Sequence, residues 1–146
     1  MKSEDEPISA DEWLLRRVRK EKFRTDKNPL ISPNAFEPRI KGDHPDTDGI
    51  SLFREACQQI PTDILSAIAS DKRGENGIVK IPVTLIQQLG MSVKMIRDEQ
   101  ISGHVVIPEL NAVDYANAKM KFVLIKEALA NEASKDMNII LYPTAS

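Results

Sequence analysis

The chain has 146 residues, of which 41% are hydrophobic, 29% are charged and only 5% are aromatic. A chain of this length can fold as one domain, and its core must be largely aliphatic. The formal net charge of −2 argues against the bulk binding of a polyanion, and no apolar run approaches the roughly 20 residues that a membrane-spanning helix needs.

The single cysteine, Cys57, excludes a disulfide within the chain and suits a reducing compartment. The first ten residues are acidic and lack the apolar stretch of a signal peptide. We therefore expect a cytoplasmic protein with no part in a membrane. It should have a disordered acidic lead over residues 1–10 and a single domain over residues 11–146.

The apolar residues of segment 11–23 are spaced in a way that fits either a helix or a strand. Ser9 or Asp11 could cap a helix, and the spacing of Leu14 and Val18 fits a helical stripe. The run between these two apolar residues fits a strand equally well. We expect helix at the start of this segment and leave the rest open.

A proline-rich stretch with four prolines follows over residues 28–49. Proline removes a backbone donor and restricts the residue before it, so regular helix is excluded here. Loops longer than about 12–15 residues are usually functional or disordered. Apolar anchors such as Phe36 favour a loop that lies across the surface of the domain.

The middle of the chain alternates between helical and extended patterns. Residues 50–60 carry apolar side chains at a helical period, although the first four could begin as a strand. Pro61 opens a second helical run, and residues 72–77 form a polar turn. Two strands are expected further on, over residues 92–96 and 103–107.

The longest helix is expected to begin at Asn111, which can cap it, and to end near Lys135. A closing strand is expected over residues 138–142. The apolar stripe of the helix is expected to be buried, and it comprises Val113, Ala116, Met120, Val123, Leu124 and Ala128. This order of elements predicts an α+β fold with a small mixed sheet, packed helices, a long C-terminal helix and an extended proline-rich loop.

The run Gly77-Ile78-Val79-Lys80-Ile81-Pro82 indicates a short strand whose proline opens a helix, and Leu89-Gly90 closes that helix. Residues 77–91 thereby resemble the strand–helix half of the AbrB/SpoVT looped-hinge DNA-binding fold. The resemblance implies a homodimeric nucleic-acid-binding regulator in which Lys80 contacts phosphates. Arg16, Arg17 and Arg19 would add to that surface. Any short helix bounded by a proline and a glycine beside a strand gives the same pattern.

Four short segments spread along the chain carry a second resemblance. They are Trp13–Val18, Ser32–Phe36, Gly49–Leu52 and Gly103–Ile107. Together they look like a group of small bacterial cytoplasmic proteins. The resemblance implies a bacterial, cytoplasmic, single-domain protein and implies no activity.

Two histidines, His44 and His104, are the natural candidates for acid–base chemistry. His104 falls on an expected strand, where a histidine is more often structural than catalytic. If it acts as a base, Arg16 or Arg17 could hold an anion and Glu55 could be its partner. His44 lies in an acidic turn whose spacing fits no EF-hand, so we expect no metal site and no cofactor.

A further enzyme hypothesis rests on the order of polar residues. An N-terminal arginine, Ser32, Ser51 and Glu55 follow one another as do the residues that ADP-ribosyltransferase-like folds use to handle NAD. The similarity lies in order and residue type. It implies a small enzyme centred on His104 and an N-terminal arginine.

The strongest electrostatic feature is the basic segment Arg16–Lys27, where seven basic and two acidic residues give a net charge of +5. The leading hypothesis is a non-catalytic accessory protein that engages a protein partner through this segment and the proline-rich loop. The expected partner-binding residues are Arg16, Arg17, Arg19, Lys20, Lys22, Arg24 and Phe36. The AbrB-like regulator and the small enzyme stand as alternatives, and the oligomeric state is left open.

Overall fold

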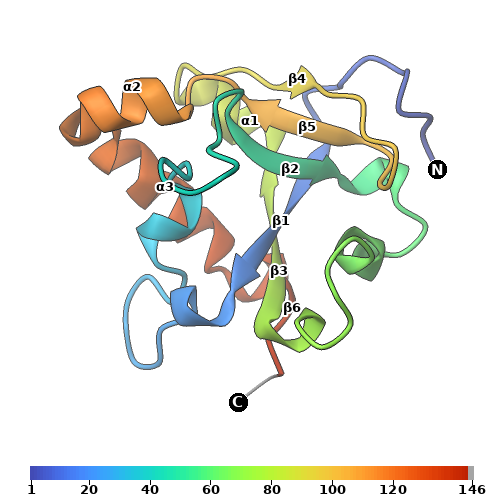
Figure 1. Cartoon of the computed structure of the whole chain (residues 1–146), viewed down its shortest axis with the longest axis horizontal. Helices are drawn as coiled ribbons and strands as arrows, with labels where there is room; N and C mark the ends of the chain where they lie inside the picture. The colour runs from blue at the N-terminus through green and yellow to red at the C-terminus, as the bar shows by residue number, and fades with distance from the viewer. Residues whose placement is uncertain (145–146) are drawn as a thin grey trace.

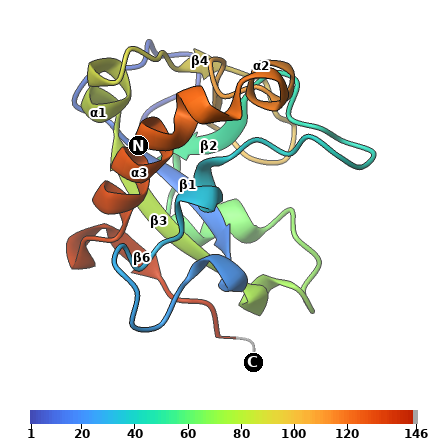
Figure 2. The same cartoon turned by 90° about the vertical axis from the view of Figure 1, so that its left-hand side faces the viewer.

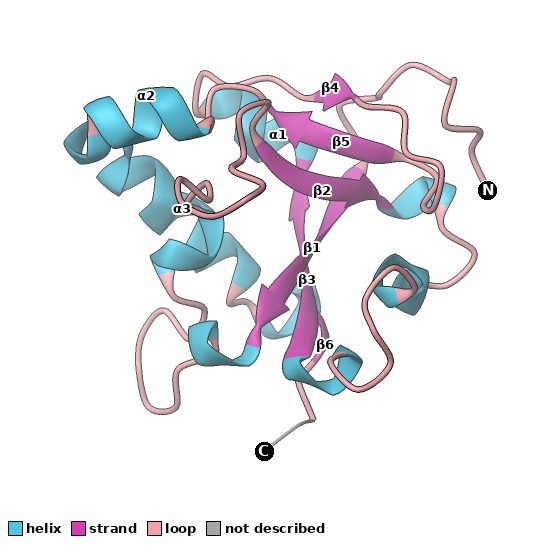
Figure 3. Ribbon diagram, viewed as in Figure 1, coloured by secondary structure: helices cyan, strands magenta, loops and turns pink. Residues whose placement is uncertain are grey.

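The computed structural model describes residues 1–144, which form a six-stranded sheet with helices packed on it (Figure 1 and Figure 3). The strand order is β4-β5-β2-β1-β3-β6. The strands are β1 (Trp13–Arg19), β2 (Ile50–Arg54), β3 (Asn76–Pro82), β4 (Lys94–Met95), β5 (His104–Ile107) and β6 (Ile139–Leu141). The helices are α1 (Val83–Gln88), α2 (Ala112–Asn117) and α3 (Val123–Ala133). The predicted α+β class is confirmed. All pairings between these strands are antiparallel, where a mixed sheet was expected.

β1 lies at the centre of the sheet, between β2 and β3. Its neighbouring residues Leu14 and Leu15 are both fully buried, because successive side chains of a strand face opposite sides and both sides of this sheet are covered. The helical start expected for this segment is therefore wrong. Burial on both faces hides the alternation that normally identifies a strand.

The helical prediction for residues 50–60 is also wrong. This segment begins as β2 and then forms a short 3-10 turn over Glu55–Cys57. The run that Pro61 opens is a 3-10 helix, Pro61–Leu65, rather than an α-helix. The strand alternative for the first residues of the segment is the correct one, since β2 pairs with β5 on one side and with β1 on the other.

The expected long C-terminal helix is divided at Ala118, whose φ of −151° and ψ of 50° are not helical. A 3-10 turn over Lys119–Phe122 then leads into α3. The predicted buried stripe is consequently wrong, because Met120 is 85% exposed and Leu124 is 78% exposed. The cap at Asn111 is confirmed: its side chain accepts a hydrogen bond from the backbone N–H of Asp114. None of the helices within residues 1–144 is long and apolar enough to cross a membrane.

The strand–helix unit over residues 77–91 forms as predicted. β3 runs into α1 at Pro82, and Gly90 follows the helix with a φ of +80°, a conformation that glycine adopts readily. β3 pairs with β1 along seven residues and with β6 on its other side. The unit thus belongs to the sheet of its own chain.

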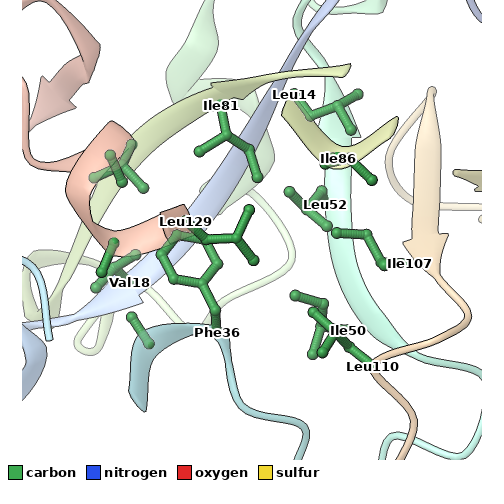
Figure 4. Close-up of a cluster of buried hydrophobic side chains, with 14 of the residues drawn as sticks. Leu14, Val18, Phe36, Ile50, Leu52, Ile81, Ile86, Ile107, Leu110 and Leu129 are labelled. Carbon is green, nitrogen blue, oxygen red and sulfur yellow. The ribbon is translucent and has the colours of Figure 1, made fainter. Parts of the chain in front are cut away.

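The two faces of the sheet carry separate cores. The larger core lies between the sheet and α3, which crosses one face (Figure 2). Its members include Leu14, Val18, Phe36, Ile50, Leu52, Ile81, Ile86, Ile107, Leu110 and Leu129 (Figure 4). The smaller core contains Leu15, Phe53, Ile64, Leu65, Ile78 and Ile101. The 3-10 helix Pro61–Leu65 covers it.

Residues 1–10 lie across Arg54, where a disordered lead was expected. The Arg54 side chain is fully buried, and its Nη1 donates to the carbonyl oxygens of Glu4 (3.3 Å) and Glu6 (2.7 Å). Its Nη2 donates to the carbonyl oxygen of Pro7 (3.3 Å). A buried guanidinium needs hydrogen-bond acceptors, and the N-terminal backbone supplies them.

Candidate functional site

The central strands β1 and β2 separate after a short contact. They pair at Leu14 with Arg54 and at Leu15 with Phe53, and no further pair forms between them. β1 then follows β3 while β2 follows β5, so the two strands diverge (Figures 1 and 3). If the register continued, Arg17 would face Ser51. Side chains of β1 and β2, among them Arg16, Arg17 and Ser51, line the gap between the two strands.

Arg16 bridges this gap from β1 to β2. Its Nη1 donates to the carbonyl oxygen of Ser51 (2.7 Å), and its Nε donates to that of Ala35 (2.9 Å). Its guanidinium carbon lies 5.8 Å from the centroid of the Phe36 ring. The pKa of Arg16 is lowered to about 10, chiefly by burial; the charge of Asp46 opposes this, and the charges of Arg17 and Arg39 add to it. The group is still a cation at neutral pH.

A cleft of about 840 Å³ opens at the divergence of β1 and β2, and we name it the β1/β2 cleft. Its volume lies within the range of small-molecule sites. Its lining includes Arg16, Arg17 and Ser51 from β1 and β2, together with residues from the segments 34–46 and 67–76. Among residues 1–144 its cationic lining side chains are Arg16, Arg17, Arg19, Lys22, Arg39 and Lys72, and its acidic ones are Glu37, Asp46 and Glu75. With His44 neutral, the lining has a net charge of +3.

The three carboxylates of the cleft are already engaged. Glu37 accepts a hydrogen bond from Tyr115 Oη (2.8 Å) and lies 3.6 Å from Lys126 Nζ. Glu75 lies 3.7 Å from Lys20 Nζ. Asp46 accepts a hydrogen bond from the backbone N–H of Arg39 (2.6 Å). Carboxylates bound in this way neutralise the cations of the cleft only partly. The lining keeps its excess of positive charge, while Arg16 and Arg17 also donate to backbone carbonyl oxygens.

His104 lies beside the cleft on β5 and contacts two polar groups. Its Nε2 is 3.0 Å from Ser51 Oγ, and its Nδ1 is 3.3 Å from Asp98 Oδ2. Its ring stacks on Phe53, with centroids 5.0 Å apart. Burial lowers the pKa of His104 and the cation of Arg17 acts in the same direction, while the charge of Asp98 opposes them. The imidazole is therefore neutral at pH 7 and can accept a proton.

The predicted enzyme residues are only partly brought together. His104 contacts Ser51 and Asp98 rather than Arg16 or Glu55. Glu55 lies on the 3-10 turn after β2 and does not line the cleft. Of the residues in the ADP-ribosyltransferase-like pattern, an N-terminal arginine and Ser51 meet in the cleft. Ser32 is buried and caps the 3-10 turn at Pro33.

The predicted partner-binding residues fall into separate environments. Arg16, Arg17, Arg19 and Lys22 line the cleft, whereas Lys20 pairs with Glu75 and Arg24 donates to the carbonyl oxygen of Pro29 (2.6 Å). Phe36 has no exposed surface, so its side chain cannot contact a partner. The prediction that Phe36 binds a partner is therefore wrong, because Phe36 packs in the core beneath Arg16.

Two other sequence candidates lie apart from the β1/β2 cleft or at its rim. Lys80 Nζ lies 4.6 Å from the centroid of the Trp13 ring and is not among the lining residues. His44 and Asp46 are at the rim of the cleft. No three histidine, cysteine, aspartate or glutamate side chains within the described residues gather as a metal site.

Sequence interpretation missed Asp98, Arg39 and Lys72 as members of the site. Asp98 lies in a polar turn between two expected strands, with no local feature that marks it. Arg39 and Lys72 come from segments far from β1 in the chain. Tertiary structure brings Arg39 and Lys72 to the cleft and Asp98 to His104.

Comparison of the chain with protein-family models, with curated proteins and with solved structures finds no match.

Proposed function

We propose that this protein is a small enzyme that binds a phosphate-bearing molecule of the nucleotide class in the β1/β2 cleft. The observation that carries the proposal is the excess of cationic side chains among the residues that line a cleft of ligand size. Guanidinium groups suit phosphate because they offer paired donors in a plane. His104 beside the cleft supplies a proton acceptor.

The electrostatics of Arg16 support an anionic ligand. Burial is the main cause of the lowered pKa of Arg16, the charge of Asp46 opposes it, and the charges of Arg17 and Arg39 act against the Arg16 cation. A bound phosphate would relieve that repulsion. Binding should therefore stabilise the folded protein, because a ligand that binds only the folded state raises its stability.

A small ligand fits this site better than a nucleic-acid duplex. The cations line a cleft of ligand size, and Lys80 lies elsewhere against Trp13. A duplex-binding surface would instead present its cations along an open face. The NAD-handling hypothesis falls within the proposed ligand class, since NAD carries a pyrophosphate.

Thermal unfolding measured with pyrophosphate, AMP, ADP-ribose and NAD tests the proposal. We expect at least one of them to raise the melting temperature in a saturable manner. Lys72→Ala should weaken binding about fivefold, the loss of about 1 kcal/mol from one exposed cation. Lys121→Ala is the matched control, because Lys121 is an exposed lysine outside the cleft. Equal effects of the two variants would show that the ligand binds elsewhere.

A protein partner is the second candidate. It is favoured by the exposure of Arg19 and of the loop tip at residues 41–45; Arg19, His44 and Pro45 all line the cleft. A pull-down washed at low and high salt separates the hypotheses. A stoichiometric protein that survives high salt supports the accessory hypothesis, and nucleic acid retained only at low salt supports the regulator. We also propose a cytoplasmic location, in keeping with one buried free cysteine.

A further inference from the structure

We propose that Asp98, His104 and Ser51 form a proton relay that makes Ser51 Oγ a nucleophile toward the phosphoryl group of an ester held in the β1/β2 cleft. The proposal rests on the proposed function for its substrate class. The relay itself is an independent geometric feature, since it consists of two contacts that do not involve the cations of the cleft.

The contacts of His104 favour one tautomer. Asp98 Oδ2 lies 3.3 Å from Nδ1, and a carboxylate can only accept a hydrogen bond, so we assign the imidazole proton to Nδ1. A neutral imidazole then has a lone pair on Nε2, which lies 3.0 Å from Ser51 Oγ. The serine hydroxyl must therefore donate to His104. This is the protonation pattern in which a histidine can remove the proton of a serine.

Each member of the relay is held in place by other contacts. Asp98 Oδ1 accepts from the backbone N–H groups of Gln100 (2.8 Å) and Ile101 (3.2 Å), which leaves Oδ2 directed at the histidine. The ring of His104 is held against Phe53 by stacking. Ser51 and His104 stand on the paired strands β2 and β5. Such preorganisation is what nucleophilic catalysis requires of its supporting groups.

The position of Ser51 suggests what the hydroxyl would attack. Ser51 lines the cleft together with Arg17, and its own carbonyl oxygen is bound by Arg16. Arg17 Nη1 donates to the carbonyl oxygen of Ile64 (3.2 Å). Negative charge on the equatorial oxygens of a phosphoryl group would be stabilised by these guanidinium groups. The cations and the nucleophile thus serve the same substrate.

The proposed step transfers a phosphoryl group from an ester to Ser51. Ser51 Oγ forms a bond to phosphorus, the bond from phosphorus to the alcohol oxygen breaks, and the alcohol leaves with that electron pair. The hydroxyl proton of Ser51 passes to Nε2 of His104, which becomes a cation facing Asp98. The departing alkoxide takes a proton from water. In the second step the hydroxide left by that water attacks the phosphorus of the phosphoserine, and the bond from phosphorus to Ser51 Oγ breaks. Nε2 of His104 returns its proton to Oγ, and hydrogen phosphate is released.

A fluorophosphonate probe tests the nucleophile directly in the full chain. Ser51 Oγ would attack its phosphorus, fluoride would leave, and the proton would pass to His104. We expect mass spectrometry to find one phosphonyl group, on Ser51. The labelling rate should fall as the pH drops through the pKa of His104. His104→Gln should lower the rate on the order of 100-fold and remove this pH dependence, and Asp98→Asn should lower it as well.

Ser92→Ala is the matched control. Ser92 Oγ donates to the Glu109 carboxylate (2.7 Å) on the exposed surface, so it is a hydrogen-bonded serine that faces no histidine. The labelling rate of this variant should equal that of the unaltered chain. Circular dichroism of His104→Gln and Asp98→Asn shows whether they remain folded. Asp98 lies outside the strands and helices, so we expect Asp98→Asn to remain folded. If His104→Gln unfolds, the labelling rate of Asp98→Asn tests the relay.

The outcomes separate this proposal from the proposed function. Labelling of Ser51 that depends on His104 and is blocked by pyrophosphate supports both. Labelling that depends on His104 without any binding of phosphate compounds supports the relay and overturns the proposed ligand class. Binding of pyrophosphate without labelling of Ser51 overturns the relay and leaves the ligand proposal standing. Labelling that is unchanged in a folded His104→Gln also overturns the relay.

Discussion

Glu12 and Arg54 form a two-bond ion pair in the interior of the protein. Arg54 Nε donates to Glu12 Oε1 and Arg54 Nη2 donates to Glu12 Oε2, both at 2.8 Å. The two side chains are 3% and 0% exposed, respectively. This pair joins the segment before β1 to the end of β2, at the end of the sheet where the two strands are still in contact. The ion pair therefore holds β1 and β2 together at the end where they are paired, next to the point where they diverge to form the cleft.

The pair makes stability depend on pH in the acid range. Burial alone would raise the pKa of Glu12, but hydrogen bonds from Arg54 and from the Ser9 backbone outweigh it and lower the pKa from 4.5 to about 2. A carboxyl with a lowered folded pKa contributes stability above its unfolded pKa and loses it as the pH falls toward the folded value. We expect about 3 kcal/mol of unfolding free energy to be lost between about pH 5 and pH 2.

Denaturant titrations at several pH values measure this loss. Glu12→Gln should be less stable than the unaltered chain at pH 7 and should show a flatter pH profile between pH 5 and 2. Glu99→Gln, on an exposed carboxylate, serves as control. Identical pH profiles for the unaltered chain and Glu12→Gln would refute this assignment.

Removal of the buried Arg54 cation should lower the unfolding free energy more than removal of an exposed arginine. Arg54→Ala leaves the Glu12 carboxylate buried with Lys2 as its remaining charged neighbour, at 3.4 Å. Breaking a buried pair in this way typically costs about 3–5 kcal/mol. Arg97→Ala, at an arginine that is 80% exposed, should change the unfolding free energy by less than about 1 kcal/mol. Comparable losses in the two variants would contradict the buried position of Arg54.

The orientation of α3 is tested by two leucines of the same helix. Leu129 has no exposed surface, whereas Leu124 is 78% exposed. Leu129→Ala should lower the unfolding free energy by about 2–5 kcal/mol because it removes buried methyl groups and leaves a cavity. Leu124→Ala should have little effect. A larger loss of unfolding free energy for Leu124→Ala than for Leu129→Ala, measured by urea unfolding, would contradict this orientation and support the predicted stripe.

The turn before β5 depends on Gly103. Its φ is +78°, and a Cβ added there would lie 2.6 Å from the Cβ of Cys57. Gly42 has a similar φ of +92° but no atom within 4 Å of an added Cβ. Alanine at either position adds backbone strain, so the difference between them isolates the overlap with Cys57. We expect Gly103→Ala to be the less stable variant by about 1–3 kcal/mol. Equal melting temperatures would contradict this.

Local signals predicted some elements of the fold well. Pro82 and Gly90 bound α1 as expected, and Asn111 caps α2. The division of the C-terminal helix at Ala118 had no such signal, because alanine is the best helix former and no proline or glycine lies nearby. The strand character of β1 was hidden because Leu14 and Leu15 are buried on opposite faces.

The candidate site was harder to predict than the fold. His104 was recognised as a histidine on a strand, and Ser51 was named in one enzyme hypothesis. Their contact depends on the pairing of β2 with β5, across more than fifty residues of chain. Asp98 reaches His104 only through the geometry of its turn. Such relationships are set by tertiary structure, which periodicity and spacing do not encode.

The central claim is that the β1/β2 cleft binds a phosphate-bearing ligand, and amide chemical shifts during a pyrophosphate titration test it most directly. We expect saturable shifts confined to residues 16–19, 22, 34–46, 51 and 67–76, which border the cleft. Arg39→Ala should weaken the titration, while Arg97→Ala at an exposed arginine outside this cleft should not. Shifts spread evenly over the surface, or no shift at millimolar pyrophosphate, would contradict the claim.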